Sequence, residues 1–377
     1  MKAGSIDNIS DNLLADDRLA LSEVAVFVDD DEKRSGTCIV KDSTALCAYS
    51  CVDGLELLPI AAALKKYAWL KDRYYWGIIS REKSFLYDKF SCCEEPLGYF
   101  LKVRKGMKIQ LPVQTALYMT EPDEKQLIHN IIIMEDDSEL ELITGCVSKY
   151  GVRRGEHNSI SETYIGKNVR FQNTMIHNWG ADMKVISHSA ALVEEDSRYI
   201  NNYVALRPAG TTVSDPVTYL DGRGASAKYF SIILGSEDSM ITIGGNVYLN
   251  AKETSAEIAH RAVGAGGRIL QKGLLVGNAP CHAHVDCAGM LITSGSKGFV
   301  KSVPGLKSCH PEACMSHEAS IGRIAPQQVQ YLMTYGMEER EAVSCIIRGF
   351  LDVDIHGFGH ELDRKIAQIA ELAGHGV

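Results

Sequence analysis

Short apolar runs that alternate with turn-forming residues are the feature that most constrains how this chain can fold. From residue 98 to residue 306, such runs are separated by Gly, Asn, Asp and Ser, as at residues 131–134, 231–234 and 246–250. The last of these runs alternates apolar and polar residues with a period of two, which is typical of a β-strand. Strong helix signals are scarce throughout this region, so the sequence predicts a mainly β core.

The way in which these runs are joined favours one kind of β architecture. They are many, short and connected by turns, whereas a β-sandwich would show longer connections. A short strand pair cannot bury its apolar face alone, but stacked coils of strands and turns bury a continuous core. We therefore predict a solenoid of short strands, a β-helix.

The regions on either side of the core have different sequence patterns from it. Residues 1–97 form a mixed and partly helical segment, in which residues 60–70 carry apolar residues at helical spacing. The β-helix core is expected over residues 98–320. Residues 321–377 are predicted to form a C-terminal helical domain.

The C-terminal region contains clear helix start and stop signals. Pro326 suits the first turn of a helix, and Gly336 suits its end. A second helix is expected to begin near Glu339, whose charge is favourable in a first turn. A last helix is predicted over residues 361–372.

Composition excludes several classes of function. The chain has 39 Lys and Arg against 48 Asp and Glu, a net charge of −9, which argues against a nucleic-acid partner. No run of 18 apolar residues is present, and the N-terminus lacks the apolar segment of a secretory signal. We therefore expect a cytoplasmic protein without a membrane partner. The 11 cysteines are then expected to be reduced thiols rather than disulfides.

Residues that could bind metal are concentrated near the end of the core. Residues 281–318 hold four of the 11 cysteines and four of the 12 histidines. Thiolates and imidazoles select iron–sulfur clusters, zinc or copper. The Cys-x2-Cys pairs of zinc fingers and ferredoxins are missing, so one chain does not specify a complete site. A symmetric dimer would need only half of the ligands from each copy.

Each of these residues also has a purely structural interpretation. Cys281 and Cys287 could pack inside the strand region while His282 and His284 face water. That interpretation is weaker for the dense run at residues 309–318. The metal-ligand candidates are Cys287, Cys309, Cys314, His317 and Glu318.

Four segments resemble one protein family, and they occur in the same order. Residues 317–324 (HEASIGRI), with matching positions over residues 328–350, resemble the C-terminal signature of the SufB/SufD family of iron–sulfur cluster assembly proteins. Residues 98–106, 141–146 and 284–291 resemble three upstream segments of that family. The resemblance covers most of the chain.

The resemblance implies a fold and a mode of assembly. It implies a right-handed parallel β-helix with helical segments at both ends, the pairing of two such cores, and docking of the C-terminal helices onto the ATPase SufC. The mixture of SufB-like and compact features suggests a homodimer. No G-x4-G-K-[ST] loop is present, so ATP hydrolysis would come from a separate SufC-like subunit, and the chain itself is expected to be a scaffold rather than an enzyme.

The resemblance also implies a cargo and ligands. A nascent 4Fe–4S or 2Fe–2S cluster would be built with sulfur from a cysteine desulfurase or another donor and passed to apo iron–sulfur proteins. His317 matches the histidine of the family's H-E-A-T motif, and Glu318 matches a glutamate that SufB has and SufD lacks. Cys309 and Cys314 lie close to cysteines of SufB and SufD, respectively. Cys287 lies in the segment that resembles V-E-C-D.

Two departures from the family pattern leave alternatives open. The SufB cysteine expected within residues 291–298 has no counterpart, and no cysteine occurs between Cys146 and Cys281, so a sulfur entry route is not defined. One alternative is a SufD-like structural partner that holds no cluster. Another is a β-helix carbohydrate-active enzyme with acidic residues in a groove, in which the Cys/His-rich region would have no role.

Overall fold

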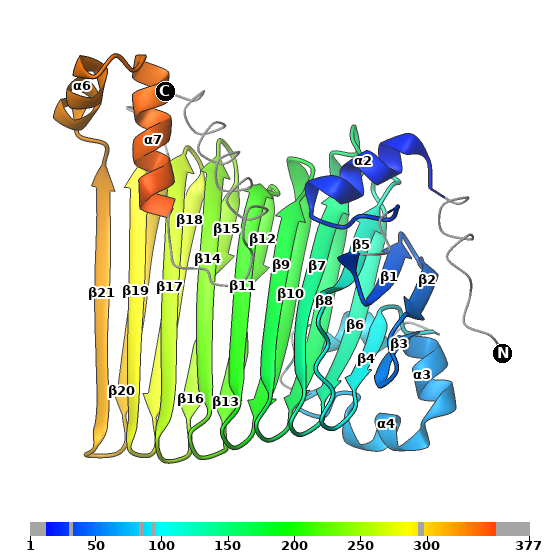
Figure 1. The fold of residues 1–377 in the computed structure, drawn as a ribbon. Helices are drawn as coiled ribbons and strands as arrows, with labels where there is room; N and C mark the ends of the chain where they lie inside the picture. Colours follow the sequence, from blue (N-terminus) through cyan, green and yellow to red (C-terminus); the bar gives the residue numbers. More distant parts are fainter. Residues whose placement is uncertain are drawn as a thin grey trace.

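The structure, a computed structural model, is a parallel β-solenoid of about eight turns built from two facing sheets (Figure 1). It describes residues 13–29, 33–82, 84, 86–91, 95–292 and 298–351, with the backbone alone at residues 47 and 206. The predicted mainly β solenoid is confirmed. The right-handed sense of the coil stays a prediction.

The first sheet, sheet A, contains ten strands, and all neighbours after the first pair are parallel. In spatial order its strands are β2 (Thr44–Ser50), β1 (Gly36–Lys41), β5 (Val113–Met119), β7 (Glu139–Ser148), β9 (Arg170–Asn178), β11 (Arg198–Arg207), β14 (Ser226–Ser236), β17 (Thr254–Ala265), β19 (Cys281–Leu291) and β21 (Ala313–Arg323).

The second sheet, sheet B, faces sheet A across the core. In spatial order its main path is β12 (Thr211–Ser214), β15 (Met240–Ile243), β18 (Arg268–Gly277), β16 (Asn246–Leu249), β13 (Val217–Leu220), β10 (Asp182–Val193), β8 (Arg154–Ile165), β6 (Lys125–Met134), β4 (Tyr99–Val103) and β3 (Leu55–Pro59). Strand β20 (Phe299–Ser308) pairs with β18.

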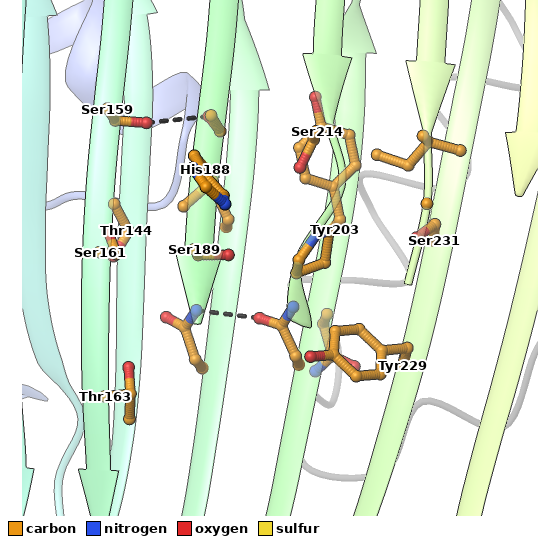
Figure 2. Close-up of a pocket in the computed structure, with 18 of the residues that line it drawn as sticks. Thr144, Ser159, Ser161, Thr163, His188, Ser189, Tyr203, Ser214, Tyr229 and Ser231 are labelled. Atoms are coloured by element: carbon orange, nitrogen blue, oxygen red, sulfur yellow. Dashed lines mark hydrogen bonds between the residues drawn. The ribbon is translucent and has the colours of Figure 1, made fainter. Parts of the chain in front are cut away.

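Side chains from both sheets fill the space between them. Alternate residues of each strand point inward, and most are apolar, such as Leu101, Val185 and Val285. A polar stretch interrupts this core near the middle of the solenoid and leaves a cavity of about 40 Å³ (Figure 2). Hydroxyl and amide groups line much of the cavity, and on the sheet A side Asn173 donates to Asn201 of the neighbouring strand at 3.0 Å.

One turn conformation repeats down one edge of the solenoid. Asp137, Asn168 and Asp196 have positive φ values of 61°, 52° and 55° in three successive turns. Gly106 and Gly224 occupy the same place in the turns before and after, with φ values of 75° and 70°. Glycine, Asn and Asp tolerate this left-handed backbone better than other residues do.

The residue before each of these positions carries a charge whose sign alternates from turn to turn. The series is Lys105, Asp136, Lys167, Glu195 and Arg223. The Lys105 ammonium lies 3.4 Å from the Asp136 carboxylate, and the Lys167 ammonium lies 3.1 Å from that of Glu195. We call this series the turn charge ladder. It links neighbouring coils through exposed ion pairs.

Short helices from the N-terminal region cover both sheets from outside. Helix α2 (Ala15–Glu23) packs on sheet A, while α3 (Ile60–Lys66) and α4 (Ala68–Arg73) pack on sheet B. The single helix expected over residues 60–70 is divided at Tyr67, which has an extended backbone. Helix α5 (Tyr87–Ser91) follows on the same side of the molecule.

A buried carboxyl group fixes the segment between α4 and α5 to sheet B. Glu162 of β8 has no exposed surface and accepts hydrogen bonds from the backbone N–H groups of Trp76, Ile78 and Ile79 at 2.7, 2.7 and 3.0 Å. The His129 ring nitrogen Nε2 lies 2.9 Å from the same carboxyl group. Four interactions therefore converge on one side chain.

The C-terminal helices stand at the far end of the solenoid (Figure 1). Helix α6 (Pro326–Thr334) begins at its proline, and Gly336 beyond its end has a φ of 91°, as the sequence signals indicated. Helix α7 (Glu339–Leu351) buries Val343 and Ile347 against the outer face of sheet A. The helix predicted at residues 361–372 lies outside the described residues.

Two further points concern the sequence predictions. The domain boundaries at residues 97/98 and 320/321 stay predictions, although β1, β2 and β3 belong to the two sheets and β21 extends to Arg323. None of the described helices has both the length and the apolar character needed to cross a membrane.

Candidate functional site

The candidate ligands lie at the open end of the solenoid, where each sheet ends in an edge strand. Among the described strands, β21 pairs with β19 alone and β20 pairs with β18 alone. Such strands present unpaired backbone N–H and C=O groups on one side. Apolar side chains are also exposed there, with Phe299, Val303 and Ile321 each 45–47% accessible. This end of the molecule has the character of a binding surface.

The pleat of β21 sends the candidate ligands to opposite faces of sheet A. In register with β19, Cys314 lies beside His282 and Glu318 beside Asp286, on the outer face. His317 lies beside Val285, which points into the core. Successive residues of a strand face opposite sides. His317 and Glu318 are therefore adjacent in sequence but separated by the sheet.

The outer face beside Cys314 and Glu318 is polar. The His284 ring nitrogen Nδ1 lies 2.8 Å from the Ser316 hydroxyl, and Arg261 forms a 2.6 Å ion pair with Asp286. His284 and Asp286 belong to β19, one strand behind the edge. Cys314 and Glu318 themselves are exposed. Both remain accessible to a partner or to an incoming ion.

Cys309 and Cys287 have contrasting surroundings. Cys309 is exposed in the turn between β20 and β21, where its backbone N–H donates to the Gly277 carbonyl at 2.8 Å. Cys287 is fully buried on the inner face of β19. Burial raises the pKa of the Cys287 thiol to about 12, which keeps it protonated near neutral pH in this state.

The five candidates do not converge within one chain. Among the described residues, no three Cys, His, Asp or Glu side chains lie close enough together to hold a metal ion. Cys314 and Glu318 are four residues apart on an extended strand, which places their Cα atoms roughly 13 Å apart. A metal centre at this edge would require ligands from a second molecule. The assignment of the five residues stays a prediction.

The sequence analysis did not identify one residue of the interior, His260. It lies in β17 between the inward-facing Ile258 and Ala262, directly in register with Cys287. Its Nε2 is 3.0 Å from the Lys272 carbonyl oxygen in the opposite sheet. The sequence does contain a signal for this pairing. His260 and Cys287 are one coil apart, and the period of two along β17 places His260 on the inner face.

The polar cavity is the other interior feature that sequence reasoning missed. Ser159, Ser161 and Ser189 point into it from sheet B, while Tyr203 and Ser231 approach from sheet A (Figure 2). A cavity needs roughly 10–15 Å³ of this volume for each water molecule. The space is therefore suited to a few ordered water molecules.

The fold and the edge strand β21 together define a class of protein: a parallel β-solenoid whose last described strand exposes thiol, imidazole and carboxyl groups. The family model described as SUF system FeS cluster assembly, SufBD core domain, matches residues 117–350. The chain therefore belongs to the SufBD family of iron–sulfur cluster assembly proteins, as the sequence resemblance predicted.

Individual relatives support the assignment over most of the chain. An iron–sulfur cluster assembly SufBD family protein of Archaeoglobus fulgidus is 35% identical, and the match covers 95% of each chain. One from Methanothermobacter thermautotrophicus is 34% identical over 93% of this chain and 87% of its own. SufB of Bacillus subtilis is 22% identical over 68% of this chain and 55% of its own. Membership of this family argues against the alternative of a β-helix carbohydrate-active enzyme.

Proposed function

We propose that the protein is a scaffold on which an iron–sulfur cluster is assembled between two copies of the chain. The observation that carries this proposal is the exposure of Cys314 and Glu318 on an edge strand that pairs with a described neighbour on one side alone. His317, on the opposite face of that strand, and Cys309, in the turn before it, complete the exposed set. Cys287 is the fifth candidate and differs from the others in being buried.

Pairing of two open ends accounts for the incomplete ligand set in one chain. A two-fold contact between equivalent edges brings the same residues from both copies to one axis, which doubles the number of ligands. Exposed apolar residues such as Phe299 and Val303 would be buried by the same contact. The cargo would be a nascent 4Fe–4S or 2Fe–2S cluster.

The chemistry of the ligands suits a scaffold that must release its product. Thiolates bind iron strongly, whereas a carboxylate such as that of Glu318 is a harder ligand that exchanges more readily. Thiols must lose a proton to bind, so cluster loading is expected to weaken at low pH.

The remaining parts of the proposed system are partners. A SufC-like ATPase would dock on α6 and α7, where Tyr331 and Tyr335 are 60% and 72% exposed. Sulfur would come from a cysteine desulfurase or another donor, and the cluster would pass to apo iron–sulfur proteins in the cytoplasm. The chain would contribute no ATP hydrolysis of its own.

A second candidate function is that of a SufD-like structural partner of the ATPase without a cluster. The observation that favours it is the absence of converging ligands among the described side chains of one chain. The two candidates differ in whether a paired assembly of this chain alone with its ATPase retains iron and sulfide.

Anaerobic reconstitution with iron and sulfide tests the scaffold proposal. We expect the wild-type protein with its ATPase to retain a cluster, seen by visible absorbance and Mössbauer spectroscopy. Cys314→Ser and Glu318→Gln should each lower retained iron and sulfide severalfold. Cys345→Ser changes an exposed cysteine of α7 that is not among the candidate ligands, and it should leave loading unchanged. A wild-type complex that retains no cluster would favour the structural partner.

A further inference from the structure

A groove of about 890 Å³ crosses sheet A at the carboxyl ends of its strands. Helix α2 forms one wall of the groove. The turns after β7, β9 and β11 and the ends of β14 and β17 form its floor. Helix α7 packs on β17 on the same face of the solenoid (Figure 1). The groove therefore extends from the helix near the start of the chain toward the last described helix.

The floor of the groove is mainly apolar. It includes Val152, Pro208 and Leu234, and Leu19 of α2 borders it with 65% of its surface exposed. Tyr150 at the rim is 90% exposed. Exposed apolar surface of this extent marks a site of protein contact. The charged residues that line the groove are of both signs: Asp16, Glu23, Lys149, Arg153, Arg207 and Glu237.

The C-terminal part of the chain contains a segment of matching length and character. The groove crosses the ends of five neighbouring strands of sheet A, from β7 to β17, which spans about 19 Å at about 4.8 Å per strand. The helix that the sequence predicts over residues 361–372 would be about 18 Å long. Leu362, Ile366 and Ile369 recur at helical spacing in this segment and would form one apolar side.

The described part of the chain ends within reach of the groove. Leu351, the last residue of α7, is fully buried in an apolar cluster that also contains Leu234 of the groove floor. The nine residues 352–360 can span up to about 30 Å when extended. A helix as short as that of residues 361–372 is marginal in water by itself, so it needs a surface on which to bury its apolar side.

We propose that residues 361–372 form a helix that docks in this groove within the same chain. The apolar side of the helix covers Leu19 and Leu234, and the two ends of the chain then close over one face of sheet A. The inference goes beyond the scaffold function and does not depend on it, since docking needs neither a cluster nor a second copy. The residues that line the groove include none of the five candidate ligands.

Hydrogen exchange of the full-length protein, measured by mass spectrometry, tests the proposal. In the wild type without any partner, residues 361–372 should exchange at least about tenfold more slowly than in a synthetic peptide of the same sequence. Ile366→Asp places a charge on the apolar side of the helix, and Leu19→Asp places one in the groove. Each variant should speed the exchange of residues 361–372 severalfold.

Two other positions provide matched controls. Gln368→Asp changes a polar position of the same segment outside the apolar side. Leu14→Asp changes a leucine that is 67% exposed and does not line the groove. Both controls should exchange like the wild type. Wild-type exchange as fast as in the peptide, or exchange that Ile366→Asp and Leu19→Asp leave unchanged, would overturn the proposal.

A photoreactive phenylalanine analogue at position 369 identifies what the segment contacts, even if Leu19→Asp fails to fold. It should link within one chain to α2 or to the turns at residues 148–153 and 178–181. A mixture of isotope-labelled and unlabelled chains separates links within a chain from links between chains.

Three results of these measurements would assign the segment or the groove differently, and each would overturn the proposal. They are links between chains, links to other surfaces, and slow exchange that appears only after the SufC-like ATPase is added. The measurements use protein without iron or sulfide. A failed cluster reconstitution would therefore count against the scaffold function and leave the docking of residues 361–372 to be decided by its own result.

Discussion

The buried Glu162 is expected to be one of the most sensitive positions for stability. Replacement by Ala removes the acceptor of three backbone N–H groups, of which that of Ile79 is buried, and the partner of His129. Each orphaned group costs roughly 1–3 kcal/mol, but the segment at residues 76–79 can detach and regain water, which limits the total. Loss of one partner of a buried polar pair typically costs about 3–5 kcal/mol, and we expect that range for Glu162→Ala.

Replacement of Glu162 by Gln separates the contribution of side-chain shape from that of hydrogen bonding. The amide fills the same space, but its NH₂ group would face a backbone donor, so we expect a cost of about 1–3 kcal/mol. The matched control is Glu257→Gln on β17, whose ion pair with Lys228 is 36–40% exposed. Pairs of that kind contribute about 0–1 kcal/mol.

Hydrogen exchange measured by mass spectrometry provides a local assay. The N–H groups of Trp76, Ile78 and Ile79 should be protected in the wild type. A local loss of about 3 kcal/mol corresponds to roughly a 100-fold faster exchange in Glu162→Ala. Chemical denaturation gives the matching global shift. If Glu162→Ala is no more destabilising than Glu257→Gln and exchange at these groups is unchanged, the Glu162 carboxyl group is not what holds the segment at residues 76–79.

Three other predictions concern pH, backbone contact and ion pairing. Desolvation raises the pKa of Glu141 from 4.5 to about 7. The folded state therefore binds the extra proton between these values, and it loses up to about 3 kcal/mol of stability as pH rises from about 4.5 to 7. The melting temperature of Glu141→Gln should exceed that of the wild type at about pH 8 and match it at about pH 4.5, and equal values at both pH values would contradict the assignment. Gly222→Ala would place a Cβ 1.9 Å from the Glu195 backbone nitrogen and should lower the melting temperature strongly, whereas Gly322→Ala meets nothing within 4 Å and should not. The Arg223–Glu253 pair is more than 60% exposed, so Arg223→Gln should lower the stability only slightly, and the loss should vanish in high salt. A large, salt-independent loss in denaturation experiments would show another role for Arg223.

Much of the fold could be predicted because its signals are local. The period of two in runs such as residues 246–250 and the turn residues between runs are properties of short segments. The strands at the N-terminal end were missed for the opposite reason. Gly36 of β1 pairs with Val113 of β5, so most of the N-terminal region separates the two partners, and no local pattern reports such a contact.

The candidate site illustrates a different limit. Strand alternation was sufficient to separate His317 from Glu318, but the sequence analysis treated them as one set. Whether a strand has a neighbour on each side depends on where the solenoid ends. The sequence of residues 313–323 does not itself show that this strand is the last one. The pairing of His260 with Cys287 required the coil length, and that length varies, as the steps from Leu127 to Asn158 and from Asn158 to Ile186 differ by three residues.

The turn charge ladder has a consequence for how this protein can change in length. Removing a single coil, for example the one that contains Lys167, would bring Asp136 next to Glu195 and set two negative charges against each other. Removing two coils would restore opposite neighbours. Each contact is weak because it is exposed at the surface, yet the preference has a fixed sign. Shortened versions of this solenoid should therefore tolerate the excision of coils in even numbers better than in odd ones.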